Sequence, residues 1–282
     1  MKKFIRFLFF VLLFILLLLI YGRYVGTDGL ITKEYNISTN IDESFNGLKI
    51  VHFSDLHYLR VTNSDKLKQI VEEINLINPD IVFFTGDLID KDFKLKDKEK
   101  DNLINLLRNI KSKYGKYAVL GNHDYMKDEE LFKEIYSSSN FILLRNEYDI
   151  IYGNNNDKIF IGGLDTYSFD KADIKKVMEY FNDNDDINYK IILGHEPDYI
   201  DEIVKDYDID LMLSGHSHNG QINIPYIKNF FFPKGSKKYY DNYYKVNNTD
   251  LYVSSGIGLS RINLRIFDKP SINFYRINKI TE

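Results

Sequence analysis

Five short polar loops, each directly after an apolar run, constrain the fold of this chain more than any other feature of its sequence. The loops comprise residues 54–57, 86–87, 121–124, 194–195 and 215–218, and together they hold five of the six histidines. The runs before them have the length and composition of buried strands. Because the ends of neighbouring strands converge at one edge of a sheet, we expect these loops to lie side by side.

The elements between and after these strands predict the fold class. Apolar residues recur at helical spacing in residues 64–77 and 97–113, and Ser64 is the expected N-cap of the first helix. Early strands therefore alternate with helices, whereas later strands crowd together and only one more helix, at 170–181, is expected. The later strands are expected at residues 141–144, 148–152, 158–163, 251–255 and 271–277. This order predicts an α/β fold, a mixed β-sandwich with helices on its outer faces, as one domain over residues 47–282.

The first 25 residues form a segment of their own. Residues 7–21 are apolar and uncharged, three basic residues precede them, and Arg23 follows. A buried core helix is disfavoured because the run has no polar face. A cleaved signal peptide stays open as an alternative, although no A-x-A-like site follows the run.

We expect residues 1–25 to be an uncleaved signal-anchor helix. The run and its flanks come near the roughly 17–25 residues that a transmembrane helix needs. The excess of basic residues before the run predicts a cytoplasmic N-terminus, with the rest of the chain outside the cell membrane. Residues 26–46 are then a polar connector that leads into an edge strand.

The residue types in the polar loops are those of a metal centre. The chain has no cysteine, so disulfides and cysteine-ligated zinc are excluded. In D-x-H and H-x-H segments the two ligands point the same way when the chain is extended. The candidate ligands are Asp55, His57, Asp87, Asn122, His195, His216 and His218. Seven ligands are too many for one tetrahedral ion and suit two divalent ions of manganese, zinc or iron, about 3.5–4 Å apart.

Each loop has a structural alternative when it is taken alone. A single D-x-H or GNHD segment is weak evidence for a metal, and GHSH alone indicates one fragment of a site. The five loops in this order, each behind an apolar strand, are a far more specific signal. His52 lies inside a strand and is expected to be an ordinary core histidine.

The five loops resemble the motif series of the calcineurin-like metallophosphoesterase superfamily, and the resemblance covers residues 48 to about 277. The matching motifs are Asp55-x-His57, Gly86-Asp87, Gly121-Asn122-His123-Asp124, Gly194-His195 and Gly215-His216-x-His218. The resemblance implies a four-layer β-sandwich flanked by helices. It also implies that one metal is held by Asp55, His57 and His218, the other by Asn122, His195 and His216, and that Asp87 bridges both.

The same resemblance implies a catalytic role for His123, which would stabilise charge at the phosphate and protonate the leaving oxygen. Asp90 occupies the place where some members of the superfamily orient that histidine. The GDxxDRG signature of Ser/Thr phosphatases is absent.

Three further segments are similar to the bacterial membrane-anchored YkuE/YaeI-like branch of the superfamily. They are residues 193–198, 214–221 and 252–272. Ser217 and Asn219 depart from the usual GHTHGGQ of that branch, but both histidines remain. Arg265 fits an arginine of the branch's closing strand, and two interpretations are open for it, a contact to phosphate or an exposed strand residue.

These features predict a hydrolase that cleaves a phosphate ester or pyrophosphate of a lipid-linked or cell-envelope molecule at the membrane. By analogy with relatives, UDP-2,3-diacylglucosamine is one such substrate. One alternative is a broad extracellular phosphodiesterase that acts on nucleotides. Another is a non-catalytic, metal-stabilised membrane protein, which is disfavoured because His123 is not needed as a ligand. The net charge of −4 argues against a nucleic-acid polymer as partner, and we expect a monomer.

The aromatic segment at 225–244 has two interpretations. It holds Phe230, Phe231 and Phe232, then three lysines, then four tyrosines. Aromatic and lysine side chains are typical of a bilayer interface. The alternative, which we slightly favour, is that the phenylalanines pack inward as a small satellite core.

Overall fold

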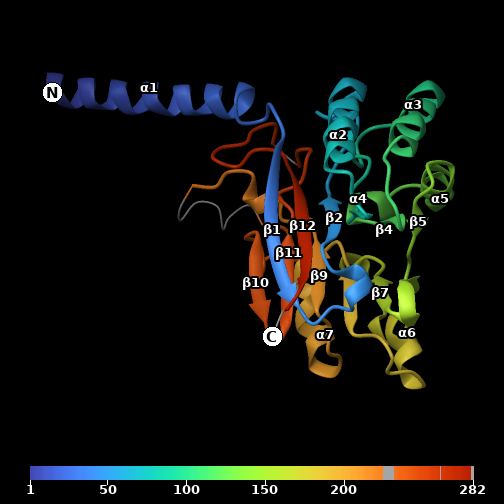
Figure 1. Cartoon of the computed structure of the whole chain (residues 1–282). Helices are drawn as coiled ribbons and strands as arrows, with labels where there is room; N and C mark the ends of the chain where they lie inside the picture. The colour runs from blue at the N-terminus through green and yellow to red at the C-terminus, as the bar shows by residue number, and fades with distance from the viewer. Residues whose placement is uncertain (225–231, 261, 281–282) are drawn as a thin grey trace.

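Two six-stranded sheets pack face to face in the computed structural model, which describes residues 1–224, 232–260 and 262–280 (Figure 1). The first sheet has the order β1-β12-β2-β3-β4-β5 and the second the order β10-β11-β9-β8-β7-β6. The strands of the first sheet are Ile31–Thr39 (β1), Leu48–Phe53 (β2), Ile81–Phe84 (β3), Gly115–Ala118 (β4), Ile142–Leu143 (β5) and Ser271–Lys279 (β12). Those of the second are Glu147–Tyr152 (β6), Lys158–Gly163 (β7), Tyr189–Leu193 (β8), Leu211–Ser214 (β9), Tyr243–Val246 (β10) and Thr249–Val253 (β11).

Helices cover the outer face of each sheet, so the domain has four layers. The helices over the first sheet are Ser64–Ile77 (α2), Asp97–Arg108 (α3) and Glu129–Ser138 (α5), and those over the second are Ile174–Val177 (α6) and Ile200–Asp206 (α7). An apolar cluster that includes Ile50 and Ile191 fills the space between the sheets. Each helical layer is joined to its sheet by a further cluster, one around Val51 and Ile70, the other around Ile192 and Ile203. The predicted α/β sandwich with outer helices is therefore confirmed.

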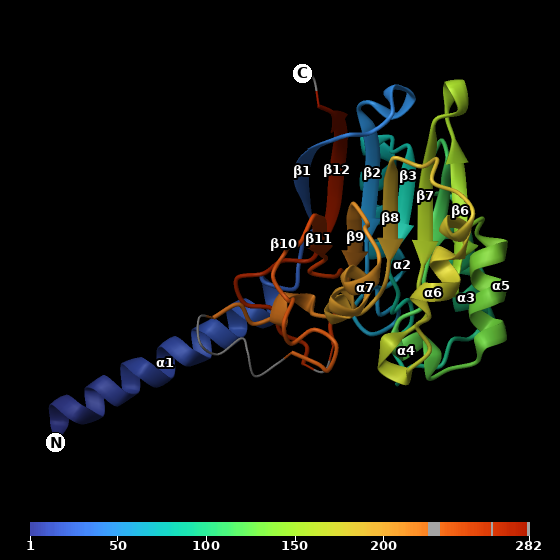
Figure 2. The same cartoon turned by 90° about the horizontal axis from the view of Figure 1, so that it is seen from below.

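The central strands of each sheet are parallel, which brings the polar loops to one end of the sandwich. In the first sheet β2, β3 and β4 run in the same direction, and in the second β7, β8 and β9 do. The carboxyl ends of such strands meet at one edge. The loops that follow β2, β3, β4, β8 and β9 carry the candidate ligands, so the topology itself gathers them (Figures 1 and 2).

Several local predictions need correction. Asn63, not Ser64, caps α2, because its side-chain oxygen accepts a hydrogen bond from the backbone N–H of Lys66 at 2.9 Å. The helix expected at 170–181 is a short α6 followed by a 3₁₀ turn at Met178–Asn182. Helix α5 was not predicted, although it buries apolar residues at helical spacing. Strand β10 was also missed, because its half-exposed, tyrosine-rich sequence gives no clear alternation.

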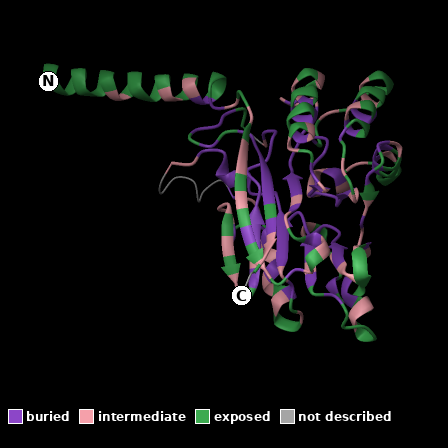
Figure 3. Cartoon of the chain, viewed as in Figure 1, coloured by how far each residue is buried: buried purple, intermediate pink, exposed green. Residues whose placement is uncertain are grey.

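The N-terminal helix α1 (Lys2–Tyr24) projects away from the sandwich (Figures 1 and 2). It is long and apolar enough to cross a membrane, and nearly all of its residues are exposed or partly exposed (Figure 3). Gly22, at its last turn, is its one buried residue. An apolar helix that is exposed over most of its length needs another apolar environment, and a bilayer supplies one.

Candidate metal centre

The structure brings all seven predicted ligands together at the end of the sandwich. Asp55 and His57 follow β2, and Asp87 follows β3. Asn122 begins the one-turn helix α4 (Asn122–Tyr125) after β4. The three remaining histidines follow β8 and β9 in the other sheet. Six of the seven residues are buried, and Asn122 is half-buried.

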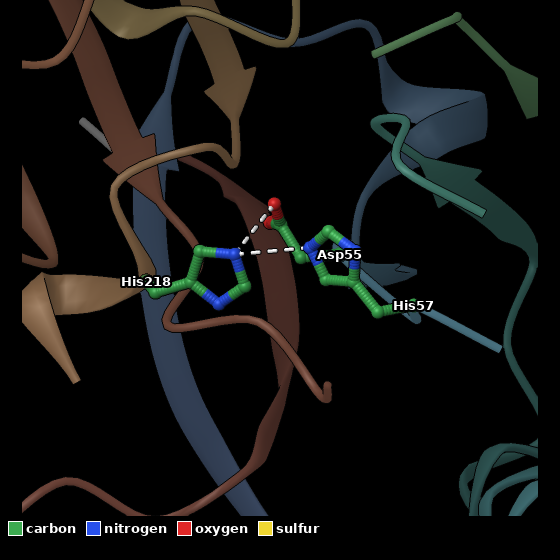
Figure 4. A group of neighbouring side chains, drawn as sticks. All are labelled: Asp55, His57 and His218. Atoms are coloured by element: carbon green, nitrogen blue, oxygen red, sulfur yellow. Dashed lines mark hydrogen bonds and ion pairs between the residues drawn. The ribbon is translucent and has the colours of Figure 1, made fainter. Parts of the chain in front are cut away.

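The first group of ligand atoms comes from Asp55, His57 and His218 (Figure 4). His218 Nε2 lies 3.2 Å from Asp55 Oδ1 and 3.2 Å from His57 Nε2. The carboxylate and both imidazoles thus point at one place, although they come from loops of two different sheets. One oxygen and two nitrogens in such a cluster suit a divalent transition metal.

The second group combines Asp87 with His195 and His216. His195 Nδ1 lies 2.6 Å from the carbonyl of Thr85, and His216 Nε2 lies 2.9 Å from the carbonyl of Lys234. A carbonyl only accepts, so each of these nitrogens carries its proton, and the other nitrogen of each neutral ring has a free lone pair.

Those two free nitrogens, His195 Nε2 and His216 Nδ1, face each other at 3.1 Å. Two lone pairs so close repel unless a cation, either a metal ion or an added proton on one ring, lies between them. A backbone carbonyl that fixes the far nitrogen of a histidine is also the usual outer contact of a metal ligand. The donor set therefore fits a metal ion.

Asp87 lies between the two groups. Its Oδ2 is 3.4 Å from His195 Nε2 and 3.7 Å from His57 Nε2, while its Oδ1 accepts the backbone N–H of His123 at 2.8 Å. Burial alone would lower the pKa of His195, but the charge of Asp87 holds it well above its ordinary value. The position beside Asp87 thus favours positive charge, which a divalent cation supplies more strongly than a proton.

The side-chain oxygen of Asn122 also fits the role of a metal ligand. Asn122 Oδ1 is buried and has no hydrogen-bond partner among the described residues. A buried amide oxygen without a partner costs about 1–3 kcal/mol, and a metal ligand role would remove that cost. Asn122 follows Gly121, whose substitution would place a Cβ 2.2 Å from Asp87 Oδ1, so this loop can approach Asp87 only with glycine there.

The backbone is strained at most of these ligands. Positive φ angles occur at Asp55 (52°), His57 (42°), Asp87 (58°), His216 (65°) and His218 (49°). Such angles cost roughly 1–3 kcal/mol each for residues other than glycine, and they persist where function requires a set geometry. Five strained residues among seven candidates are an independent sign that this cluster is a functional site.

His123 lies at the mouth of the cluster, and its side chain is 13% exposed. Its ring atoms come within 4.8 Å of ligand atoms of His57 and Asp87. The expected partner Asp90 is not hydrogen-bonded to it, because Asp90 Oδ2 lies 4.0 Å from His123 Nδ1 but 3.5 Å from His57 Nδ1 and 2.9 Å from Arg60. Asp90 Oδ2 thus lies near both histidines and is hydrogen-bonded to neither, so the orientation of His123 by Asp90 stays a prediction. His123 Nδ1 instead accepts the backbone N–H of Lys91 at 3.4 Å.

Asp124 is a residue of the site to which the sequence assigned no role. Its buried carboxylate accepts hydrogen bonds from the backbone N–H groups of Asp87, Leu88 and Gly121 at 2.8, 2.9 and 3.1 Å. Burial, and then the charge of Asp87, raise the pKa of Asp124 to about 7. Asp124 ties the Asp87 loop to the Asn122 loop. The signal was present as the last letter of GNHD, but a polar residue that positions backbone has no spacing rule of its own.

Both interpretations of Arg265 are wrong. The side chain is fully buried, so it is neither an exposed strand residue nor a contact for phosphate. Its guanidinium donates to Asp268 at 2.8 Å and to the carbonyls of Ser255, Gly256 and Gly258 at 2.7 to 3.0 Å. Since Gly258 N–H donates in turn to the carbonyl of Asp55 at 2.7 Å, Arg265 supports the first ligand loop from behind.

The remaining predictions have mixed outcomes. His52 is a core histidine as predicted, hydrogen-bonded to Thr85 at 2.8 Å, and burial lowers its pKa to about 3. Phe230 and Phe231 lie outside the described residues. Phe232 is 8% exposed and stacks on Tyr240 with 4.2 Å between ring centroids, so this phenylalanine packs inward.

A pocket opens onto the ligand cluster. Five ligand-type residues contribute to its lining, and so do several apolar ones. They are Asp87, Asn122, His123, His216 and His218, with Ile222, Pro233 and Ile262. A concave site with a few convergent polar groups and an apolar wall is the usual form of a small-molecule site.

Comparisons with known proteins agree with this geometry. The profile of the calcineurin-like phosphoesterase family matches residues 48–220. The metallophosphoesterase YkuE of Bacillus subtilis is 32% identical over 259 residues, which are 91% of this chain and 88% of that protein. The UDP-2,3-diacylglucosamine pyrophosphatase LpxG of Chlamydia muridarum is 29% identical over 226 residues, covering 64% of this chain and 67% of that protein.

A solved structure supports the fold alone. The sulfate thiohydrolase SoxB of Thermus thermophilus superposes with a TM-score of 0.52 at 11% identity, covering 83% of this chain and 57% of that one.

Proposed function

The chain belongs to the calcineurin-like metallophosphoesterase family, and on that premise we propose that it is a two-metal phosphoesterase acting on a lipid-linked or cell-envelope molecule. The bond cleaved is a phosphate ester or a pyrophosphate. The observation that carries the proposal is the position of Asp87 between two separate groups of ligand atoms.

The two ligand groups support two ions. Asp55, His57 and His218 would hold one. The other would be held by Asn122, His195 and His216, with Asp87 shared between both ions. Two divalent cations held there would supply an activated water and positive charge for the phosphoryl oxygens. Manganese, zinc and iron all suit this mixture of imidazole, carboxylate and amide oxygen.

His123 would act on the leaving group. Its ring lies beside Asp87 at the pocket mouth and remains partly exposed, where a substrate oxygen can reach it. The backbone N–H of Lys91 points at Nδ1, so Nε2 carries the proton of the neutral ring and faces away from that contact. A proton held at Nε2 can pass to the departing oxygen, and a positioned acid of this kind contributes about 10²–10⁴-fold to a rate.

Two observations support a lipid-linked substrate. The pocket has an apolar wall, formed in part by Ile222 and Ile262, which a purely ionic substrate would not need. The apolar helix α1 supports a chain held at a membrane. The basic residues before its apolar run favour an N-terminus in the cytoplasm and a domain outside. The similarity to LpxG, whose name states a diacylated pyrophosphate substrate, agrees with this substrate class.

The test combines metal analysis with hydrolysis by the full chain in detergent. The wild type should bind two ions per chain. It should hydrolyse at least one of p-nitrophenyl phosphate, its bis ester, a nucleotide or a phospholipid when manganese, zinc or iron is present. Asp87→Asn should lose activity and at least one ion per chain, since a neutral amide cannot serve two cations. Asp186→Asn is the control and should match wild type, because this exposed carboxylate precedes β8 and pairs with Lys158 at the start of β7, whereas the ligand loops follow the strands. An unchanged ion count with wild-type turnover in Asp87→Asn would refute the two-metal scheme.

A further inference from the structure

We propose that residues 262–267, here called the strap, lie in the membrane interface and lead an acyl chain of the substrate from the bilayer into the metal pocket. The substrate chemistry in this proposal rests on the proposed function, but the position of the strap does not. The partner is a lipid of the leaflet in which α1 ends.

The end of α1 lies directly on the strap (Figures 1 and 2). The backbone N–H of Arg265 donates to the carbonyl of Gly22 at 3.0 Å. A Cβ at Gly26 would lie 1.9 Å from the carbonyl oxygen of Arg265, and one at Gly22 would lie 3.0 Å from it. Only glycine permits two backbones to approach this closely. The strap is therefore fixed to the helix and does not merely lie near it.

A cluster of buried apolar side chains connects the membrane helix to the metal pocket. Leu18, within the apolar run of α1, packs against a cluster formed by Ile222, Leu264 and Ile266. Ile222 also lines the pocket that contains Asp87 and His123, and so does Ile262 of the strap. The three residues of the cluster are at most 9% exposed, so they form the apolar backing of the strap, and an acyl chain that runs over the exposed Ile262 would enter the pocket beside Ile222.

The strap also presents apolar side chains to the outside. Phe267 is 64% exposed, and Ile262 is 45% exposed. The ring of Phe267 lies 6.2 Å from that of Tyr21 in the last turn of α1, and aromatic side chains are enriched at membrane interfaces. Phe267 adopts a φ of 58°, an angle that a bulky residue rarely takes, which supports a role for its outward position.

The length of α1 that contacts the strap fits the depth of a membrane interface. Leu18 and Tyr24 are six residues apart, which is about 9 Å along a helix. Amphipathic segments at a membrane surface bury their apolar face by roughly 5–10 Å. If α1 spans the bilayer, the strap lies at the boundary between headgroups and acyl chains, and the pocket opens there.

The first experiment measures position without any need for turnover. Because the chain has no cysteine, Phe267→Cys gives a single labelling site. The full chain is labelled with an environment-sensitive fluorophore and reconstituted in phosphatidylcholine vesicles. The control is Ile142→Cys, which is 43% exposed on β5, at the opposite edge of the sheet from β1. Nitroxide-bearing lipids should quench the label at 267 several-fold more than the label at 142. Equal quenching by lipid, with equal access to aqueous iodide, would overturn the proposal.

The second experiment tests the acyl chain with two diesters that share one scissile bond, methyl and dodecyl 4-nitrophenyl phosphate. Each buried methylene is worth about fourfold in binding, so the wild type should prefer the dodecyl ester by more than about tenfold in kcat/KM. Ile262→Asp should bring that ratio toward one, whereas the exposure-matched Ile142→Asp should leave it unchanged.

The outcomes separate the two proposals. Hydrolysis of both esters without a chain-length preference would refute acyl guidance and leave the phosphoesterase intact. No hydrolysis of any phosphoester would refute the proposed function, while the quenching result would still decide whether the strap lies in the membrane.

Discussion

Replacing Arg265 with Met should destabilise the fold strongly, although the residue contacts neither metal ligand side chains nor the pocket. The guanidinium is completely buried and serves four acceptors, one carboxylate and three carbonyls. Methionine fills most of the volume but donates no hydrogen bond, so all four acceptors would lose this donor.

The magnitude follows from these contacts. Breaking a buried ion pair by removal of one partner costs about 3–5 kcal/mol. Lys33 Nζ lies 3.7 Å from the other oxygen of Asp268 and would compensate part of the lost charge, which places the expected loss near the lower end, about 3 kcal/mol. For a domain of this size such a loss lowers Tm by roughly 6–12 °C.

The assay is thermal unfolding of the full chain in detergent with a chelator present, so that metal binding does not contribute to the stability measured. Arg276→Met is the matched control, because Arg276 lies on β12 with its side chain exposed, and it should change stability by no more than about 0.5 kcal/mol. Arg265→Lys should lower Tm by less than Arg265→Met and by more than Arg276→Met, since one ammonium group cannot reach four acceptors. Equal Tm values for Arg265→Met and Arg276→Met would refute the argument.

Two further predictions concern catalysis and topology. His123→Ala should retain both ions and lower the rate by about 10²–10⁴-fold, with the smallest loss for substrates whose leaving group needs no proton, and loss of metal in this variant would instead make His123 a ligand. Protease added to intact cells should digest the domain, because the basic residues before the apolar run favour an N-terminus in the cytoplasm. Full protection until lysis would reverse the orientation and favour a cytoplasmic substrate.

The sequence predicted the fold class and the metal centre because both depend on local patterns. Buried strands are continuous apolar runs, and Gly, Asp and His in the loops after them have few other uses in such a combination. Parallel pairing of β2 with β3 and of β8 with β9 then brings these loops together without further information. His57 and His218 meet at 3.2 Å although they are 161 residues apart.

The sequence could not predict the contacts that hold the ligand loops from behind. Asp90 matched a motif position for orienting His123, yet its carboxylate accepts a hydrogen bond from Arg60 at 2.9 Å and lies 4.0 Å from His123, because motif spacing does not determine a side-chain direction within a loop. Arg265 was expected at the surface or at phosphate, and it is buried against three carbonyls. Carbonyls that lack a partner leave no mark on the sequence, so a residue that satisfies them cannot be recognised before the fold is known.

The same reasoning explains why the N-terminal helix belongs to the structure of the site. Gly22 accepts a hydrogen bond from the backbone of Arg265, whose side chain binds the carbonyl of Gly258, and Gly258 donates to the carbonyl of Asp55. Each step is a direct hydrogen bond of 3.0 Å or less. A helix connected in this way cannot rotate freely against the domain, because any rotation would break the contact between Gly26 and the strap. If α1 crosses a membrane, the distance of the metal pocket from the bilayer is therefore set by the fold and not by the length of a linker.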